Sequence, residues 1–526
     1  MKTRINLLCA ALSLSAVSTL AAAPFTFGVI GDTQWSGADP TGNNINTVAV
    51  NQINAVNTQF VKAGVDFVIQ VGDLTNTGSD ASLKTRLDVN SALNSAGIAF
   101  YGLRGNHEAT DANQAYFQNN YIPASSADVT VVKGPDNTSY SVTYKDTKLV
   151  LLDINTSTNT TTQAAQTTWM SNQLATTDHT QSFVFSHKNL LGQNHKDNQF
   201  GSSNDANPAD QNTFFKALAD NNVKYAISGH DHMHHRSVVT SPDGTAKVQE
   251  IITASDSYKY YTPSTPYSSR ETPVAQELNK TGYYLYTVDG PHVTGKYYAT
   301  TPLANGDIAA NPTWSLQEKF GYSLNGTNTL VAQGGSFALT HSIASGTSFG
   351  ENGYRGTTMA ILSGTNGDTD KTYDGRALTK DLEIGWAPAS HGPANSLSDV
   401  LRIWGMSDLG QGDQTDTFAL SLTFDTSGLS LDTLSNYSIA SLDAAGNWLN
   451  AVDLNFGGMK TFVAGAYDTR YTLGTYGVDL EKHTAWAVLN HNSDFVVSSA
   501  IPEPSTYALL GAATLGLIVF FRRRMR

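Results

Sequence analysis

Short apolar runs alternate with longer amphipathic segments in the first part of the chain. The apolar runs fit buried strands, and the longer segments have the spacing of helices that cover a sheet. The order is strand, helix, strand, helix, strand, at residues 25–30, 45–64, 66–71, 81–97 and 98–103. This alternation implies parallel strands joined by right-handed crossovers and therefore predicts an α/β fold.

The same pattern continues to about residue 300 and then changes. The expected elements are a hairpin at 139–146 and 148–155, helices at 164–177 and 211–222, and strands at 182–186, 224–228, 249–255, 282–288 and 292–300. Beyond residue 312, short alternating runs are separated by Gly, Asn and Asp turns, which is typical of a β sandwich. We therefore predict an α/β domain at 24–305 and a β-rich accessory domain at 312–497.

The N-terminal end has the features of a secretory signal peptide. Residues 1–23 contain a basic start, an apolar run and small residues, with cleavage expected near Ala21 to Ala23. The only cysteine, Cys9, lies inside this segment. The mature protein would therefore have neither disulfides nor thiolate metal ligands.

The C-terminal end, residues 501–526, combines three features in order. It begins with Pro502-Glu503-Pro504, continues with an apolar stretch at 505–521 that can just span a bilayer, and ends in an arginine cluster. This end resembles the PEP-CTERM sorting signal of Gram-negative bacteria. The resemblance implies recognition by an exosortase, contact with the inner membrane through one span, and a location in the cell envelope or outside the cell. The alternative is an ordinary C-terminal anchor.

Composition and charge agree with an exported protein. Only 15% of the residues are charged, and the formal net charge is −13. The basic residues at the two ends belong to the predicted targeting segments, so the mature body is more acidic still. An acidic body argues against nucleic acid as the main partner.

Residues that can bind metal ions follow the ends of five predicted strands. In open α/β folds, ligands bind at the carboxyl ends of the strands, so these positions should converge on one site. The residues concerned are Asp32, Gln34, Asp73, Asn106, His107, His187, His230 and His232.

Such a set suits two divalent ions held about 3.5–4 Å apart, which clamp the attacking and leaving oxygens of an in-line displacement. Asp73 is the candidate bridging ligand, because a carboxylate offers two oxygens. A hydroxide that bridges the ions would be the nucleophile. The other expected ligands are Asp32, Gln34 and His232 for one ion, and Asn106, His187 and His230 for the other.

These blocks resemble the calcineurin-like metallophosphoesterase family, whose pattern is GD-x-H, GD, GNH[DE], a lone His and GH-x-H. The resemblance covers about residues 25–300. It implies a four-layer α/β (α+β) sandwich and a metal-dependent phosphoric ester hydrolase. It extends to a structural segment of the family, which is represented by Asp153, Gln166, Trp169 and Leu174.

The resemblance also assigns roles to single residues. His107 would protonate the leaving oxygen or stabilise the transition state. Arg104 matches an arginine that grips phosphate in the Ser/Thr phosphatase branch, and the alternative for Arg104 is a surface salt bridge. Gln34 replaces the usual histidine of the first block, which makes that ion richer in oxygen ligands and favours Mn²⁺ or Fe²⁺, with Zn²⁺ still possible.

The substrate class stays open between phosphomonoesters, nucleotides, phosphodiesters and phospholipids. A different kind of function is also open, namely an envelope or matrix adhesion protein with a non-catalytic metal site. The remaining histidines are expected to lie in loops or on the surface, among them His195. His234 and His235 follow the last block and are expected to have no part in the site, with contact to the substrate as the alternative. Asp231 is expected to serve the turn.

Overall fold

The computed structural model describes most of the chain between residues 23 and 499. The described residues are 23–37, 39, 42–154, 163–331, 336–338, 357–362, 372–407, 412–424, 426, 431–443 and 445–499. The predicted signal peptide, apart from Ala23, and the predicted span at 505–521 lie outside them. Within the described ranges, no helix is both long enough and apolar enough to cross a membrane.

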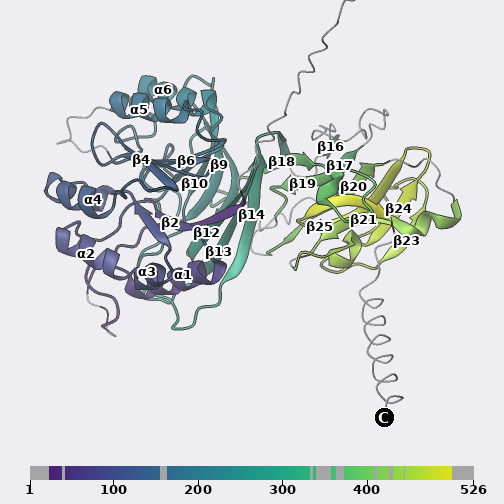
Figure 1. The fold of residues 1–526 in the computed structure, drawn as a ribbon, viewed down its shortest axis with the longest axis horizontal. Coiled ribbons are helices and arrows are strands. Elements are labelled where there is room, and N and C mark those ends of the chain that lie inside the picture. Colours follow the sequence, from purple (N-terminus) through teal and green to yellow (C-terminus); the bar gives the residue numbers. More distant parts are fainter. Residues whose placement is uncertain are drawn as a thin grey trace, which may run out of the picture.

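Two mixed sheets form the N-terminal part of the protein (Figure 1). The first sheet has the order β14 (Ser315–Ser323), β13 (His292–Thr300), β12 (Thr281–Asp289), β1 (Phe25–Ile30), β2 (Phe67–Gln70) and β3 (Ala99–Gly102). The second has the order β11 (Glu271–Glu277), β9 (His234–Thr240), β10 (Lys247–Ile252), β8 (Tyr225–Ser228), β7 (Gln181–Phe185), β6 (Thr147–Leu151), β5 (Tyr140–Tyr144) and β4 (Val129–Lys133).

The strand pairing confirms the predicted α/β pattern. Strands β1, β2 and β3 pair in parallel, as the strand–helix alternation required. Strands β5 and β6 form the predicted antiparallel hairpin, and β6, β7 and β8 continue in parallel. Strands β4, β9, β11 and β14 were not among the predicted elements.

Helices cover the outer face of each sheet (Figure 1). Helices α1 (Val50–Ala63) and α3 (Ser91–Ser95) contact the first sheet, and α5 (Gln163–Leu174) and α6 (Pro208–Asp220) contact the second. Phe27 and Ile69 from one sheet and Phe183 and Ile227 from the other belong to one buried core. The architecture is thus helix, sheet, sheet, helix, which confirms the four-layer sandwich.

The single helix expected at 81–97 is two helices, α2 (Asp80–Asp88) and α3. Asn90 lies between them and is buried. Its Oδ1 accepts hydrogen bonds from Arg86 Nη1 at 2.7 Å and from Asn57 Nδ2 at 3.3 Å. The tertiary contact with Asn57 and the weak helix propensity of the intervening residues together favour the break between α2 and α3. A further short helix, α4 (Gln114–Asn120), follows β3.

The C-terminal part is built from two more sheets around a core of its own. One sheet has the order β15 (Thr327–Val331), β18 (Lys380–Ala387), β19 (Val400–Trp404), β26 (Asp494–Ser499), β21 (Tyr437–Leu442) and β22 (Trp448–Asn450). The other has the order β16 (Ser336–Ala338), β17 (Thr358–Ile361), β20 (Gln414–Thr423), β25 (Thr484–His491), β24 (Thr475–Asp479) and β23 (Thr461–Ala464). This part is largely β, as predicted.

Strand β14 lies at the junction of the two parts (Figure 1). It pairs with β13, and its Phe320 and Tyr322 fill the core between the first two sheets. It also contacts β18 and β19 of the C-terminal part. The domain boundaries at 305 and 312 stay a prediction, but the pairing places Ser315–Ser323 in the first sheet and not in the β-rich part.

Candidate metal centre

The ends of five strands bring the predicted residues together. Asp32 and Gln34 follow β1, Asp73 follows β2, and Asn106 follows β3, whereas the histidines follow β7 and β8 of the other sheet. Two groups have donor atoms that all lie within 4.8 Å of one another: Asp73 with His187 and His230, and Asp32 with Asp73 and His232. Asp73 belongs to both groups, and all five side chains are buried.

Glycines in the motifs allow the loops to approach this closely. A Cβ on Gly105 would lie 2.1 Å from Asp73 Oδ1, and one on Gly229 would lie 2.7 Å from Asp32 Oδ2. In addition, Asp73, His230 and His232 have positive φ angles of 41°, 69° and 51°. Such left-handed conformations are unfavourable for side chains with a Cβ and are concentrated at functional sites.

Asn106 and His107 lie at the start of a 3₁₀ turn, η1 (Asn106–Glu108). Asn106 Oδ1 is 2.9 Å from His187 Nε2. The backbone N–H of His107 donates to Asp73 Oδ1 at 3.1 Å, and His107 Nε2 is 3.8 Å from Asp73 Oδ2. His107 Nδ1 is 2.8 Å from the backbone oxygen of Asn76, which holds the ring with its other nitrogen towards Asp73.

The amide of Gln34 is fully buried between the acidic and imidazole groups. Its Nε2 donates to Asp73 Oδ2 at 3.1 Å and lies 3.3 Å from His232 Nε2. Its Oε1 is buried without a hydrogen-bond partner among the described residues. A buried oxygen without a donor is costly, unless a cation takes the place of the missing donor.

Buried charge dominates the electrostatics of the site. Burial alone would raise the pKa of Asp73, but the charge of His187 and its hydrogen bond lower that pKa well below its usual range. Burial would likewise lower the pKa of His187, yet the charges of Asp73 and Asp32 raise it to about 9. The two aspartates therefore stabilise positive charge at this site.

Buried groups outside the donor set hold the loops in place. Glu108 accepts hydrogen bonds from the backbone N–H groups of Leu74, Thr75 and Gly105 at 3.2, 2.9 and 3.0 Å, which ties two motif loops together. Burial, followed by the charge of Asp73, raises the pKa of Glu108 to about 7. His187 Nδ1 lies 3.0 Å from the backbone oxygen of Val71. That contact sets the orientation of the His187 ring.

Arg104 does not face the donor groups, which corrects its predicted phosphate contact. Its side chain is buried, and Nε and Nη2 donate to the two carboxylate oxygens of Asp153 at 2.9 and 2.5 Å. Nη1 donates to the backbone oxygen of Thr110 and to Asn113. The alternative of a surface salt bridge is also wrong, because the ion pair is buried. Gln166 donates to the backbone oxygen of Asp153, so the family segment serves structure here.

A loop that the sequence analysis left without a role lies against the site. The His195 ring packs on His230 with centroids 4.3 Å apart, and its Nδ1 is 2.8 Å from Asp231 Oδ1. Asp231 also accepts from Asn189 and from the backbone of Gln193, and thereby orders the loop. His195 and Gln193 follow no strand end directly, so strand-end reasoning could not find them. Lys188, which follows His187 in the chain, forms an ion pair with Asp197. Asp197 Oδ1 in turn lies 3.3 Å from His230 Nε2.

Two further histidines and one tyrosine complete this region. His234 and His235 begin β9 and point away from solvent: His234 contacts Glu318 at 3.0 Å, and His235 contacts Glu271. Both histidines therefore stabilise the fold through buried contacts with glutamates. The Tyr261 ring packs against both His232 and His195, with centroids 5.0 and 4.9 Å apart. Tyr261 thus covers the site from a segment for which the sequence gave no signal.

Comparison with known proteins identifies the first part of the chain. Residues 25–234 match the family model of calcineurin-like phosphoesterases, and residues 500–524 match the PEP-CTERM protein-sorting motif. No curated protein matches. Similar solved structures include PhoD, with 13% identity over 58% of this chain and 70% of that chain and a TM-score of 0.41.

Two other solved structures are similar at the same level. Purple acid phosphatase PPD1 from yellow lupin (Lupinus luteus) seeds is 12% identical, with 57% of this chain and 54% of that chain covered and a TM-score of 0.41. GAP50, the anchor in the inner membrane complex of Plasmodium, is 15% identical, with 53% and 85% covered and a TM-score of 0.37. With TM-scores below 0.5, these structures do not help to assign the family of this chain. The assignment comes from the two family models. The chain contains a calcineurin-like phosphoesterase domain at residues 25–234 and ends in a PEP-CTERM sorting motif at residues 500–524.

Proposed function

We propose that the protein is an exported, dinuclear metal-dependent phosphoesterase that hydrolyses phosphate mono- or diesters. The observation that carries this proposal is the position of Asp73 in both groups of donor atoms. A carboxylate shared by two groups can bridge two ions, because each of its oxygens can bind one. The remaining ligands of the two ions are Asp32, Gln34 and His232, and Asn106, His187 and His230.

The chemistry of the donor set supports divalent cations. The carboxylates supply oxygen ligands on one side, and Gln34 adds Oε1 when its amide is turned so that the oxygen takes the place of Nε2 beside Asp73. Mn²⁺ or Fe²⁺ is favoured over Zn²⁺ on that side. When bound, two such ions supply an activated water and neutralise charge on the phosphoryl oxygens. Two aspartates balance only part of the charge of two divalent ions, so the centre attracts an anionic phosphoryl group.

His107 is the residue that we assign to proton transfer. Its Nδ1 is held by the backbone oxygen of Asn76, and its Nε2 lies at the edge of the donor groups, 3.8 Å from Asp73. Its side chain is 23% exposed, so a substrate can reach it. Because Nδ1 donates its hydrogen to that carbonyl oxygen, Nε2 carries a proton in the imidazolium form. In that form His107 gives the Nε2 proton to the leaving oxygen and becomes neutral, or donates a hydrogen bond to the phosphoryl group in the transition state.

The C-terminal motif supports export and contact with the membrane. A PEP-CTERM motif is a protein-sorting signal, so an exosortase is the expected partner of residues 500–524. The phosphoesterase domain would then act at the cell envelope or outside the cell.

The test is a metal-reconstitution assay on the full-length protein. After chelation, the protein is loaded with Mn²⁺, Fe²⁺ or Zn²⁺, and hydrolysis of p-nitrophenyl phosphate and of bis-p-nitrophenyl phosphate is measured together with bound metal per chain. We expect chelation to abolish hydrolysis and Mn²⁺ to restore it best. The Asp243→Asn variant, which changes an exposed turn aspartate, is the matched control for Asp73→Asn.

The outcome also separates the proposal from the alternative function. A protein that binds two ions per chain but hydrolyses neither ester, nor any other ester in a broad panel, would have a non-catalytic metal site. A protein that binds no more than one ion would disprove the bridging role of Asp73.

A further inference from the structure

Each predicted ligand histidine has two ring nitrogens, and two of the three rings divide them in the same way. Nε2 of His187 lies 3.2 Å from Asp73 Oδ1, and Nε2 of His232 lies 3.4 Å from Asp32 Oδ1. The Nδ1 atom of each ring lies 3.0 Å from a backbone oxygen. One nitrogen thus belongs to the donor set, and the other is held by an acceptor of its own, which fixes the ring.

His230 differs, because the acceptor that holds its ring is a carboxylate. Its Nε2 lies 3.3 Å from Asp197 Oδ1. Asp197 belongs to neither of the two groups of donor atoms found among the described residues, so it contacts the ring from outside the donor set. An ionised carboxylate only accepts hydrogen bonds, so Nε2 carries the hydrogen of this contact. Nδ1 then keeps the lone pair that can bind an ion.

Asp197 is itself held in place by a lysine. Lys188 Nζ lies 2.8 Å from Asp197 Oδ2, which leaves Oδ1 for His230. Lys188 directly follows His187, so this ion pair ties the loop that carries Asp197 to the end of β7. Because the ammonium group balances the carboxylate, the pair orients the His230 ring and adds almost no net charge to the centre.

We propose that Asp197 is a positioning residue of the metal centre, which holds His230 so that Nδ1 binds the ion shared with Asn106 and His187. This proposal rests on the dinuclear function proposed above. An outer carboxylate fixes the tautomer of a metal-binding imidazole and makes it a more basic ligand, and its loss typically costs about 10–100-fold in metal affinity. Loss of Asp197 should therefore weaken one ion and spare the ion that is held by Asp32, Gln34 and His232.

The first test needs no metal. Histidine is labelled with ¹⁵N in the full-length, metal-free protein, and NMR shows which ring nitrogen of His230 carries the hydrogen at a pH where the ring is neutral. The signals are assigned with His230→Ala. We expect the hydrogen on Nε2 in the wild type and a mixture of both tautomers in Asp197→Ala. A hydrogen on Nδ1 in the wild type, or an unchanged pattern in Asp197→Ala, would overturn the proposal.

The second test is a Mn²⁺ titration against a competing chelator, which gives the dissociation constant of each ion. Asp197→Ala should raise one constant about 10–100-fold and leave the other unchanged, and Asp197→Asn, which keeps an acceptor oxygen, should lose less. Asp178→Ala is the matched control, because Asp178 also contacts a lysine and a histidine, Lys148 at 3.0 Å and His179 at 3.1 Å. Both constants should stay those of the wild type in this control.

A merely structural role of Asp197 would give a different result. The metal-free Asp197→Ala variant should unfold at the wild-type midpoint, because a half-exposed ion pair contributes little to stability. Unchanged metal affinities in Asp197→Ala, or equal weakening of both ions together with a lower midpoint, would reject the positioning role.

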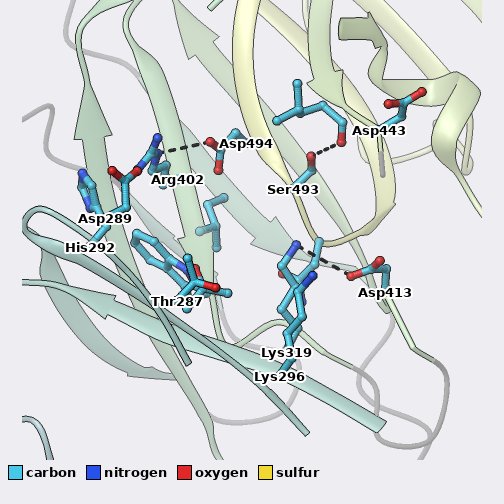
Figure 2. A pocket seen from close by; sticks show the side chains of 15 residues that line it. Thr287, Asp289, His292, Lys296, Lys319, Arg402, Asp413, Asp443, Ser493 and Asp494 are labelled. Carbon is cyan, nitrogen blue, oxygen red and sulfur yellow. Dashed lines mark hydrogen bonds and ion pairs between the residues drawn. The ribbon is translucent and has the colours of Figure 1, made fainter. Parts of the chain in front are cut away.

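The lysine is tested in the same titration. Lys188→Met should weaken the same ion by less than Asp197→Ala does, because the carboxylate remains. Lys319→Met is the matched control: Lys319 is 22% exposed, as Lys188 is, and pairs with Asp413 in a cavity at the junction of the two parts (Figure 2). No weakening in Lys188→Met would contradict the part assigned to the lysine.

The wild type separates this proposal from the proposed function. A wild type that binds fewer than two ions would reject the dinuclear function, whereas the tautomer of His230 in the metal-free protein would still decide whether Asp197 holds the ring.

Discussion

Replacing Arg104 with methionine should destabilise the phosphoesterase domain and leave the metal centre intact. The side chains of Arg104 and Asp153 are only 2% and 1% exposed, and two hydrogen bonds join them. Removing the guanidinium leaves the Asp153 carboxylate buried without its cation. Loss of one partner of a buried pair typically costs about 3–5 kcal/mol. We expect the free energy of unfolding to fall by that amount.

A second variant checks the physical reason. In Arg104→Met/Asp153→Leu no buried charge remains, so most of the lost stability should return. Thr138 Oγ1 donates to Asp153 at 2.7 Å and would lose its acceptor. Asn113 Oδ1 would likewise lose the hydrogen bond from Arg104 Nη1. The double variant should therefore stay about 2 kcal/mol below the wild type, because two buried polar groups have each lost a partner.

The assay is urea unfolding monitored by amide hydrogen exchange. The exchange rates report the stability of β3 and β6 separately from that of the strands of the β-rich part. Arg470→Met, in an exposed pair with Asp468, is the matched control and should not change the unfolding midpoint. KM and metal content of folded Arg104→Met should remain those of the wild type. An increase of KM by about 10-fold, with unchanged stability, would refute this reasoning and restore the phosphate contact.

Four further changes test other parts of the structure. Asp73→Asn should lose both ions, measured as metal per chain, because it removes the bridging charge. His107→Ala should keep both ions and lose activity by about 10²–10⁴-fold, less for esters whose leaving group needs no proton. Gln34→His should raise the Zn²⁺/Mn²⁺ occupancy ratio in a competition experiment, because imidazole nitrogen is a softer donor than an amide oxygen. Burial lowers the pKa of His491 to about 4, so the unfolded chain binds more protons than the folded chain between pH 6.5 and 4. The free energy of unfolding of the β-rich part should therefore be full above pH 6.5 and fall by up to about 3 kcal/mol towards pH 4. In urea unfolding at several pH values, His491→Gln should flatten this profile.

The sequence predicted the parts of the fold that depend on local periodicity. Strands such as β1 and β13 lie where the apolar pattern placed them, because a buried strand needs a continuous or alternating apolar run. Strand β9 was missed because it begins with His234, His235 and Arg236, which a single-sequence pattern assigns to a loop. These polar groups are buried together with Glu271 of β11 and Glu318 of β14, which pair with them and lie far away along the chain.

The same distinction explains which site residues could be predicted. Asp32 and Asp73 follow strand ends, and parallel strands bring their ends to one edge, so chain order alone suggested that they meet. His195 reaches His230 through a loop whose course is set by Asp231. Arg104 follows a strand end too, but its partner Asp153 is 49 residues away, and sequence could not show which of two directions the guanidinium takes.

Strand β14 connects the metal centre to the β-rich part through buried charges. The segment that carries His232 continues directly into β9, where His234 and Arg236 both contact Glu318 of β14, Arg236 Nη2 at 2.6 Å. Arg236 Nη1 also lies 3.4 Å from Asp381 on β18. Loss of Asp381 or Glu318 would leave the charge of Arg236 buried with fewer counterions, which is destabilising. Through Asp381, the β-rich part therefore stabilises β9, the strand that follows the last motif. The two parts are therefore joined by more than the linker between them, and the β-rich part helps to hold the site-bearing strand in place.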